Sequence, residues 1–228
     1  MKSGLIITID GPAASGKSTA ARLLAERLRA RFLDTGAMYR AVTLAAMKAG
    51  VDMTDDKQLL AVLENTEFRF SEKEGKVIVY IDGSDVTERI RQPQVTANAR
   101  YIASAEKIRQ KLVEMQRQFA ADYQRIVTEG RDQGTVAFSD ADIKFYLDAD
   151  VEERAKRRQA EMAAKGITDG LDRIRQAIEH RDRSDESRTA GPLKPADDAV
   201  IVDTTNLSIE EVVEKLLLCV KEKCPKKN

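Results

Sequence analysis

The sequence predicts a three-layer α/β fold, in which helices cover both faces of a parallel sheet, together with an insertion that contains a small antiparallel sheet. Short apolar, β-branched runs typical of buried parallel strands alternate with segments of helical period, from residues 5–9 to residues 199–203. Residues 68–81 depart from this alternation, because apolar and polar side chains take turns there as in an antiparallel hairpin. A hairpin between helices does not belong to a parallel sheet, so we expect it in a separate insertion.

The composition is that of one α/β domain with an insertion, or of two small domains. The chain has 228 residues, and its 38 basic and 38 acidic side chains cancel, so the net charge favours neither nucleic acid nor an anionic membrane as a partner. No apolar run approaches the roughly 20 residues of a membrane span. Cys219 and Cys224 have no neighbouring histidine or second cysteine pair, which argues against zinc and for a reducing, cytoplasmic compartment. We expect no signal peptide, since residues 1–4 run directly into the first strand.

Residues 11–18 match G-x-x-x-x-G-K-[ST], the pattern of a phosphate-binding P-loop. A strand-like run precedes them, and a segment with Ala20 and Leu24 at helical spacing follows, which is the context that the motif requires. Glycines let successive N–H groups point into one concavity, and the helix N-terminus adds partial positive charge. Lys17 would reach the β- and γ-phosphates of ATP, and the Ser18 hydroxyl would ligate Mg²⁺. The alternative is a glycine-rich turn before an ordinary helix.

The insertion is expected to combine helices with the antiparallel hairpin. Its predicted elements are a short strand at 32–33, a helix over 38–49 closed by Gly50, a helix over 55–65, the hairpin over 68–81 with a turn at 73–76, and a helix over 108–119. We therefore expect residues 36–120 to form the insertion, between two parts of the core domain at 1–35 and 121–228.

The second part of the core again runs from a strand into a glycine-rich loop. Residues 126–129 predict the strand, and residues 130–136 predict a loop at its carboxyl end, where α/β proteins bind ligands. After the next strand, at 143–148, the predicted helix carries three arginines at spacings i, i+3 and i+4, which are Arg154, Arg157 and Arg158. This shared face either meets a charged ligand or is a solvated charged surface. Gly166 and Gly170 indicate flexible ends.

The helix expected from residue 171 changes character along one face. Apolar side chains lie at spacings of three and four over residues 171–178, and the same spacing then reaches three charged side chains, Arg181, Asp185 and Arg188. A buried seam does not accept unpaired charges, since each costs on the order of several kcal/mol. We therefore expect this half of the face to border a polar cavity. The alternative is that the helix leaves the core at His180, a surface residue, with Asp182 and Arg183 equally exposed.

Together these segments resemble the bacterial type of cytidylate kinase, a family of nucleoside monophosphate (NMP) kinases among the P-loop NTPases. The resemblance covers essentially the whole chain and rests on residues 11–18, 34–40, 130–136, 181–188, 192–193 and 196–199. It implies a three-layer P-loop NTPase core with a parallel sheet, an inserted NMP-binding domain enlarged by the small antiparallel sheet, and a short arginine-bearing lid over about 154–170.

The resemblance also implies which residues bind and react. The implied catalytic side chains are Lys17, Arg131, Arg154, Arg158 and Arg188. ATP would be bound by Gly11, Pro12, Ala13, Ala14, Ser15, Gly16, Lys17, Ser18, Thr19 and Arg157, with Mg²⁺ on Ser18. CMP would be bound by Thr35, Tyr39, Arg40, Arg109, Gly130, Arg131, Asp132, Arg181, Asp185 and Arg188, with Arg109 and Asp132 as the readers of the base.

The implied activity is ATP-dependent phosphorylation of CMP, and of dCMP, in pyrimidine nucleotide metabolism. No general base is needed, because the accepting phosphate oxygen is already ionised. The implied enzyme is a cytoplasmic monomer that binds small-molecule substrates and neither nucleic acid nor membrane. One departure is Arg100, which stands where the family often has a serine near the base.

Two alternative functions remain open at this point. The first is a kinase of the same fold for another acceptor, such as UMP or a metabolite hydroxyl. The second is a GTPase-like switch, which is disfavoured because the tetrapeptide N-K-x-D, typical of guanine-selective switches, does not occur in the sequence.

Overall fold

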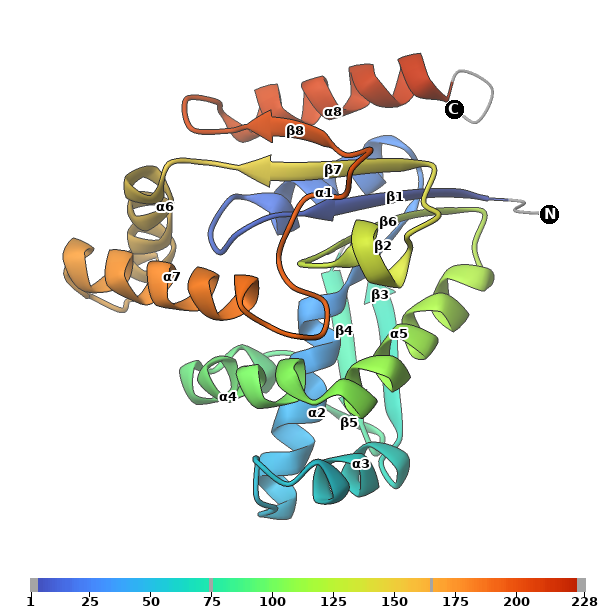
Figure 1. Cartoon of the computed structure of the whole chain (residues 1–228), viewed down its shortest axis with the longest axis vertical. Helices are drawn as coiled ribbons and strands as arrows, with labels where there is room; N and C mark the ends of the chain where they lie inside the picture. The colour runs from blue at the N-terminus through green and yellow to red at the C-terminus, as the bar shows by residue number, and fades with distance from the viewer. Residues whose placement is uncertain (1–3, 74–75, 165, 225–228) are drawn as a thin grey trace. The chain divides into compact units, whose positions relative to one another are not determined.

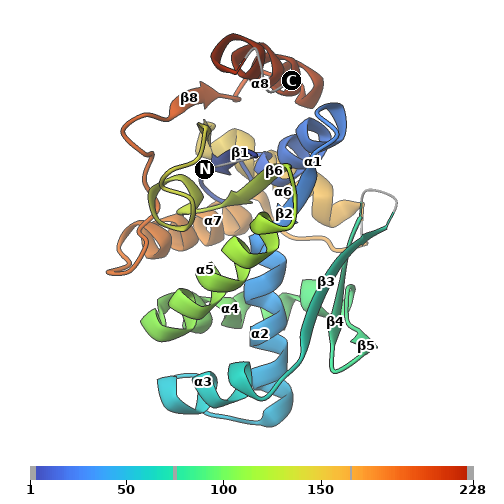
Figure 2. The same ribbon diagram turned by 90° about the vertical axis from the view of Figure 1, so that its right-hand side faces the viewer.

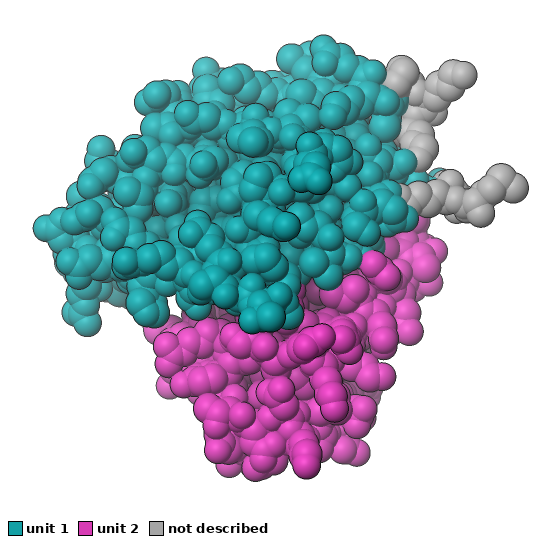
Figure 3. Space-filling model, viewed as in Figure 1, with its two compact units in different colours: residues 1–32, 124–228 teal, residues 33–123 magenta. Residues whose placement is uncertain are grey.

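The computed structural model describes residues 4–73, 76–164 and 166–224 (Figure 1), so the predicted N-terminal lead-in at 1–3 and the centre of the predicted turn at 74–75 lie outside the described residues. The chain divides into two compact units. The described residues among 1–32 and 124–228 form the core unit, and those among 33–123 form the inserted unit (Figure 3). In the described ranges, no helix is long and apolar enough to cross a membrane.

The core unit is built on a five-stranded sheet with the order β2-β6-β1-β7-β8. The strands of this sheet are β1 Leu5–Asp10, β2 Arg31–Asp34, β6 Arg125–Gly130, β7 Ile143–Asp148 and β8 Val200–Asp203. The division between the two units falls within β2, after residue 32. The pairs β1–β6, β1–β7 and β7–β8 are parallel. In this register Asp10 lies opposite Gly130 on one side and Tyr146 on the other. The carboxyl ends of three adjacent strands therefore meet beside the P-loop.

Helices complete the core unit on both faces of this sheet. They are α1 Lys17–Arg27, α6 Val151–Ala163, α7 Leu171–Glu186 and α8 Ile209–Lys223, with a short π-helical turn, η2 Gln133–Ala137. Helix α1 packs against α8 and β6, and α6 packs against α7. The consecutive residues Ile126 and Val127 are both buried, as expected of a parallel strand covered on both faces. The predicted α/β fold with a parallel sheet is confirmed.

The inserted unit contains the predicted antiparallel sheet and a layer of helices. Its elements are α2 Thr35–Ala49, α3 Asp56–Glu64, β3 Phe68–Lys73, β4 Lys76–Ile81, β5 Ser84–Asp85, the 3₁₀ turn η1 Arg89–Arg91, α4 Pro93–Ser104 and α5 Glu106–Ala121. Figure 2 shows α2 between the small sheet and the helices α4 and α5. Phe70 lies opposite Val79 in the hairpin, and Val79 is fully buried against α2 residues such as Ala41.

Three local features differ from the sequence-based expectations. Helix α4 was not predicted, because its sequence is largely polar and only Val95 and Ile102 are fully buried apolar residues. The stretch expected as a glycine-rich loop after β6 instead continues as the π-helical turn η2. The buried side of α5 includes Arg109 and Gln116, so polar side chains occupy part of the face that was expected to be apolar.

Gly50 offers a clean test of backbone conformation in this fold. It follows α2 with φ 67°, in the left-handed region, and a Cβ placed there would meet nothing within 4 Å. Because only the conformation opposes a side chain, Gly50→Ala is expected to lower the free energy of unfolding by about 1 kcal/mol. Gly50→Asn should lose less, since Asn tolerates this conformation. Urea denaturation of the three proteins measures both values, and equal stability of all three would contradict the assignment.

Candidate active site at the carboxyl edge of the core sheet

The P-loop leaves β1 at a point where only glycine fits. A Cβ on Gly11 would lie 2.1 Å from the carbonyl oxygen of Leu147 on β7, and the φ of Gly11 is 152°. Gly16, with φ 85°, directly precedes α1, which begins at Lys17. The motif thus stands between a buried strand and a helix N-terminus, which is the arrangement that binds phosphate groups.

The ammonium of Lys17 is buried against the loop that precedes it. Lys17 is 5% exposed, and its Nζ donates a hydrogen bond to the Pro12 carbonyl oxygen at 2.7 Å. Burial is the largest cause that lowers the pKa of Lys17 to about 7; Arg131 adds to it, and Glu129 opposes it. A polyphosphate in the loop would supply the negative charge that this ammonium needs.

The donor set beside the P-loop fits a nucleotide-bound magnesium ion. The Ser15 hydroxyl is 1% exposed and has no hydrogen-bond partner, whereas Ser18 is exposed at the N-terminus of α1. Among the residues that the structure describes, no three His, Cys, Asp or Glu side chains gather as a metal site. Mg²⁺ in phosphoryl-transfer sites takes few protein ligands and is held largely by substrate phosphates and water. A single hydroxyl, that of Ser18, is compatible with this mode.

Three of the predicted acceptor-site residues lie together in the core unit. Arg131 Nε donates to Asp185 Oδ2 at 2.8 Å, and Arg188 Nη1 lies 3.8 Å from Asp185 Oδ1. Burial would raise the pKa of Asp185, but Arg131, Arg188 and Arg181 together lower it. Asp185 therefore stays ionised and holds two guanidinium groups in one place.

The predicted face of α7 is one position out of register. Arg181 is exposed, whereas Asp182, four residues after Ile178, is 7% exposed. The helix ends at Glu186, so Arg188 lies beyond it. The alternative, in which Asp182 is as exposed as Arg183, is wrong, because a residue four positions after a buried one returns to the buried side of a helix.

Asp10 is a functional candidate that sequence reasoning missed. Its two carboxylate oxygens accept hydrogen bonds from the backbone N–H groups of Gln133 at 2.9 Å and Gly134 at 2.7 Å. A Cβ on Gly134 would lie 3.0 Å from the Thr8 hydroxyl. The π-helical turn η2 is thus held against the end of β1 by these two hydrogen bonds and by the close packing at Gly134. The sequence signal that could have revealed Asp10 is an acidic residue at the end of an apolar strand, directly before the P-loop.

The three arginines of α6 do not share one environment, contrary to the expectation of a common face. Arg154 is buried, and it ion-pairs with Asp182 and donates to the Ala13 carbonyl oxygen at 3.0 Å. Arg157 Nη1 donates to the Thr204 hydroxyl at 3.1 Å. Arg158 pairs with Glu161 of its own helix at 2.8 Å. The three side chains leave the helix on one face, but their guanidinium groups contact different partners.

A second group of predicted residues belongs to the inserted unit. Asp34 caps α2 through the Ala37 N–H at 2.7 Å, and its carboxylate lies 3.5 Å from Arg40 and 3.9 Å from Arg91, which the sequence analysis did not single out. The Nε of Arg40 is buried without a hydrogen-bond partner. A Cβ on Gly36 would lie 3.0 Å from Arg40 Nη1, so a side chain there would crowd this guanidinium.

The predicted base-reading arginine lies deeper in the same unit. Arg109 is 4% exposed, its Nη1 donates to the Ala103 carbonyl oxygen at 3.2 Å, and its Cζ lies 5.7 Å from the centre of the Tyr39 ring. Thr35 is buried at the start of α2. Asp132, 4% exposed, belongs to the core unit, directly before η2.

Comparisons with known proteins converge on one family. The family model for cytidylate kinases matches residues 7–222. Cytidylate kinases from Bacillus thuringiensis (strain Al Hakam) and Bacillus cereus (strain AH187) are each 42% identical over 217 residues, which cover 95% of this chain and 96% of the relative.

Solved structures support the fold alone. An uncharacterized protein from Eubacterium ventriosum has a TM-score of 0.53 at 15% identity, with coverage of 96% of this chain and 98% of that chain. TT1252 from Thermus thermophilus has a TM-score of 0.50 at 17% identity, with 97% and 98% covered.

The buried carboxylate of Asp10 predicts a specific pH dependence of stability. Burial raises the pKa of Asp10 from 3.8 to about 7. A raised pKa means that the folded protein holds this proton more tightly, so the contribution is fully present below pH 4 and lost as the pH rises through 7. From pH 5 to pH 8, the wild type should lose about 1–4 kcal/mol of unfolding free energy relative to Asp10→Asn.

Urea denaturation of both proteins at several pH values measures this difference. Asp172→Asn, a change at a position whose side chain is 90% exposed, controls for the loss of one charge. A difference between wild type and Asp10→Asn that does not vary with pH would contradict the prediction.

Proposed function

The chain belongs to the cytidylate kinase family, and we propose that it transfers the γ-phosphoryl group of ATP to CMP, giving ADP and CDP. The observation that carries this proposal is the family match over residues 7–222. The P-loop and the paired arginines around Asp185 are the chemical support. We further propose dCMP as a second acceptor, which differs from CMP only at the sugar.

The donor site is proposed to be the P-loop, Gly11 to Ser18, with Thr19 and Arg157. Its N–H groups and the N-terminus of α1 suit the phosphates of ATP. Arg157 contacts Thr204, whose hydroxyl lies 3.4 Å from the Ser15 carbonyl oxygen, so this arginine is connected to the loop. Mg²⁺ on Ser18 would neutralise charge on the β- and γ-phosphates of the bound nucleotide.

The acceptor-site residues are proposed one by one, from the family resemblance. The proposed phosphate ligands are Thr35, Arg40, Arg131 and Arg188. The buried Nε of Arg40, which lacks a hydrogen-bond partner, supports this role. Arg181 and Asp185 are the proposed sugar contacts. Tyr39, Arg109, Gly130 and Asp132 are proposed to line the base site.

The chemistry asks for positioning and positive charge rather than for a base. The CMP phosphate is already ionised, so this chain's residues must orient two anions, exclude water and stabilise the charge of the transferred group. Lys17, Arg131 and Arg188 are proposed for that charge, with Arg154 and Arg158 from α6.

A closing lid over about 154–170 remains part of the proposal. Arg158 is partnered by Glu161 only three residues away, an exposed pair of little energetic value. It can therefore turn to a phosphate at small cost. Arg154 is already buried, so closure would involve mainly the end of α6 and the connection that follows it.

Lys17→Met should abolish phosphoryl transfer while the fold is kept. The side chain is buried and its charge is disfavoured there, so an apolar residue of similar length fits the space. Charge-stabilising groups in phosphoryl transfer are worth about 10³-fold or more in rate, and we expect a loss of that order in kcat. A coupled assay of ADP release with CMP measures it, beside a thermal melt. Wild-type turnover by the folded variant would refute the P-loop assignment.

CMP should exceed UMP as a substrate by at least about a hundredfold in kcat/KM. An ionised Asp132 only accepts hydrogen bonds, which suits the exocyclic amine of cytosine but not the carbonyl of uracil. Arg109 only donates, which suits the accepting ring nitrogen of cytosine but not the N–H of uracil. Each unpaired buried group costs roughly 1–3 kcal/mol, so two account for this ratio.

One coupled assay over all nucleoside monophosphates tests this preference. Asp132→Asn should narrow the gap, since an amide can present its NH₂ to the uracil carbonyl. Equal kcat/KM for CMP and UMP in the unmutated protein would favour the UMP alternative instead.

A further inference from the structure

The buried carboxylate of Asp182 joins three elements of the core unit. It lies on α7, and its Oδ1 accepts a hydrogen bond from the Ala13 N–H at 2.8 Å. Its Oδ2 forms an ion pair with Arg154 Nη1 on α6. Arg154 Nη1 in turn donates to the Ala13 carbonyl oxygen at 3.0 Å, and Arg154 Nε donates to the Ala149 carbonyl oxygen at 2.9 Å.

Both backbone polar groups of Ala13 are therefore held by one ion pair. The Ala13 N–H points to Asp182 rather than into the phosphate concavity, and its carbonyl oxygen points to Arg154. The N–H belongs to the Pro12–Ala13 peptide group and the carbonyl oxygen to the Ala13–Ala14 peptide group, so two consecutive planar peptide groups are held. Holding the second of them fixes the direction of the Ala14 N–H, which lies in the same plane. The ion pair thus determines part of the shape that the P-loop presents to phosphate.

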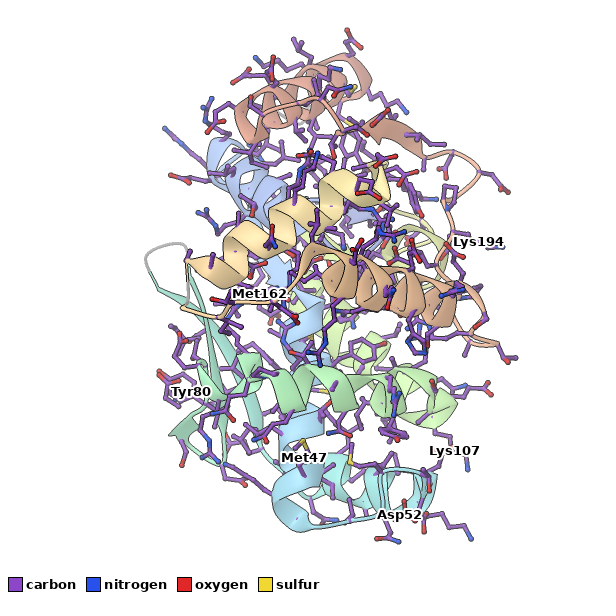
Figure 4. The ribbon with its side chains drawn as sticks, turned by 90° about the vertical axis from the view of Figure 1, so that its left-hand side faces the viewer. Met47, Asp52, Tyr80, Lys107, Met162 and Lys194 are labelled. Atoms are coloured by element: carbon purple, nitrogen blue, oxygen red, sulfur yellow. The ribbon has the colours of Figure 1, made fainter. Side chains whose placement is uncertain are left out.

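Apolar packing reinforces the same junction. Ala13, Ala155, Ile174 and Ile178 form a buried cluster, so α6 and α7 rest on the P-loop through Ala13. Met162 of α6, labelled in Figure 4, packs against the cluster. Asp182 and Arg154 are 7% and 8% exposed, which makes their pair a desolvated one that loses much when one partner is removed.

We propose that Asp182 is a positioning residue for phosphoryl transfer, which holds the Ala13 N–H of the P-loop directly and orients Arg154 for the Ala13 carbonyl oxygen and the bound nucleotide. This inference rests on the proposed function, since it assigns Asp182 a task at the donor site of that reaction. It predicts that Asp182 influences ATP and the chemical step, and that it leaves the acceptor site unaffected. An ion pair that only stabilises the fold would change stability and nothing else.

The first test is Asp182→Asn, which keeps an acceptor for the Ala13 N–H but removes the charge that orients Arg154. We expect kcat to fall about 10- to 100-fold, as small misplacements of reacting groups do, and KM for ATP to rise severalfold. KM for CMP should stay within about twofold. Glu179→Gln is the matched control, since it removes one charge from the same helix at a pair with Arg175.

A second variant guards against a failure to fold. Asp182→Leu combined with Arg154→Met replaces the pair by apolar side chains of similar size, a change that folded proteins often tolerate. We expect this protein to melt near the wild type yet to keep the loss in ATP affinity. Its kcat should fall at least as far as that of Asp182→Asn, because Arg154 is itself proposed to stabilise the charge of the transferred group. A folded double variant with wild-type kcat and KM for ATP would overturn the proposal.

Direct binding separates this proposal from the proposed function. Calorimetric titration with ATP and Mg²⁺, without any acceptor, should show weaker binding to Asp182→Asn than to the wild type and to Glu179→Gln. That comparison holds whichever monophosphate is the acceptor. Unchanged ATP binding by Asp182→Asn would overturn the inference, while a wild type that binds ATP but ignores CMP would refute the proposed function alone.

Discussion

The close approach of the chain at Gly11 to β7 is the constraint on which the site depends. With the Leu147 carbonyl oxygen 2.1 Å from any Cβ at this position, the strand can continue into the loop only without a side chain. Because β1 lies in the middle of the sheet, this passage places the loop between the carboxyl ends of β6 and β7. Asp10 directly precedes this point of the chain and holds the turn after Arg131, and Lys17 follows it and contacts the Pro12 carbonyl oxygen.

Around this edge the core unit buries an unusual set of charges. Asp10, Lys17, Glu129, Asp132, Arg154 and Asp182 are each 8% exposed or less. Buried charges persist only where partners offset their desolvation, and here backbone N–H groups, carbonyl oxygens and opposite charges serve as partners. Burial raises the pKa of Asp10 and lowers the pKa of Lys17, so that it favours the neutral form of each side chain. A polyanionic ligand would relieve the ammonium directly, so substrate binding and local electrostatics are coupled at this edge.

Sequence patterns predicted the fold, because strand–loop–helix segments and the hairpin are local signals. The ligand roles of the site residues came from the family resemblance and stay predictions. Asp182 was missed for a physical reason: after Ile178 a helical stripe continues at either 181 or 182, and only the Ala13 N–H and Arg154, distant in sequence, decide which is buried. Arg91 was missed because it lies on a 3₁₀ turn without periodicity. The contact of Arg157 with Thr204 is likewise a tertiary contact that spacing along a helix does not encode, whereas Arg158 pairs with Glu161 within its own helix.

The chain passes from the core unit into the inserted unit after residue 32 and returns at residue 124. These passages occur at β2 and just before β6, which are neighbours in the same sheet. Because the sheet is parallel, the chain that leaves β2 at the carboxyl edge must return to the amino edge before β6 can begin. The inserted unit is therefore also the crossover connection between two neighbouring strands of the core sheet, and a deletion that left only a two-residue turn could not keep these strands parallel.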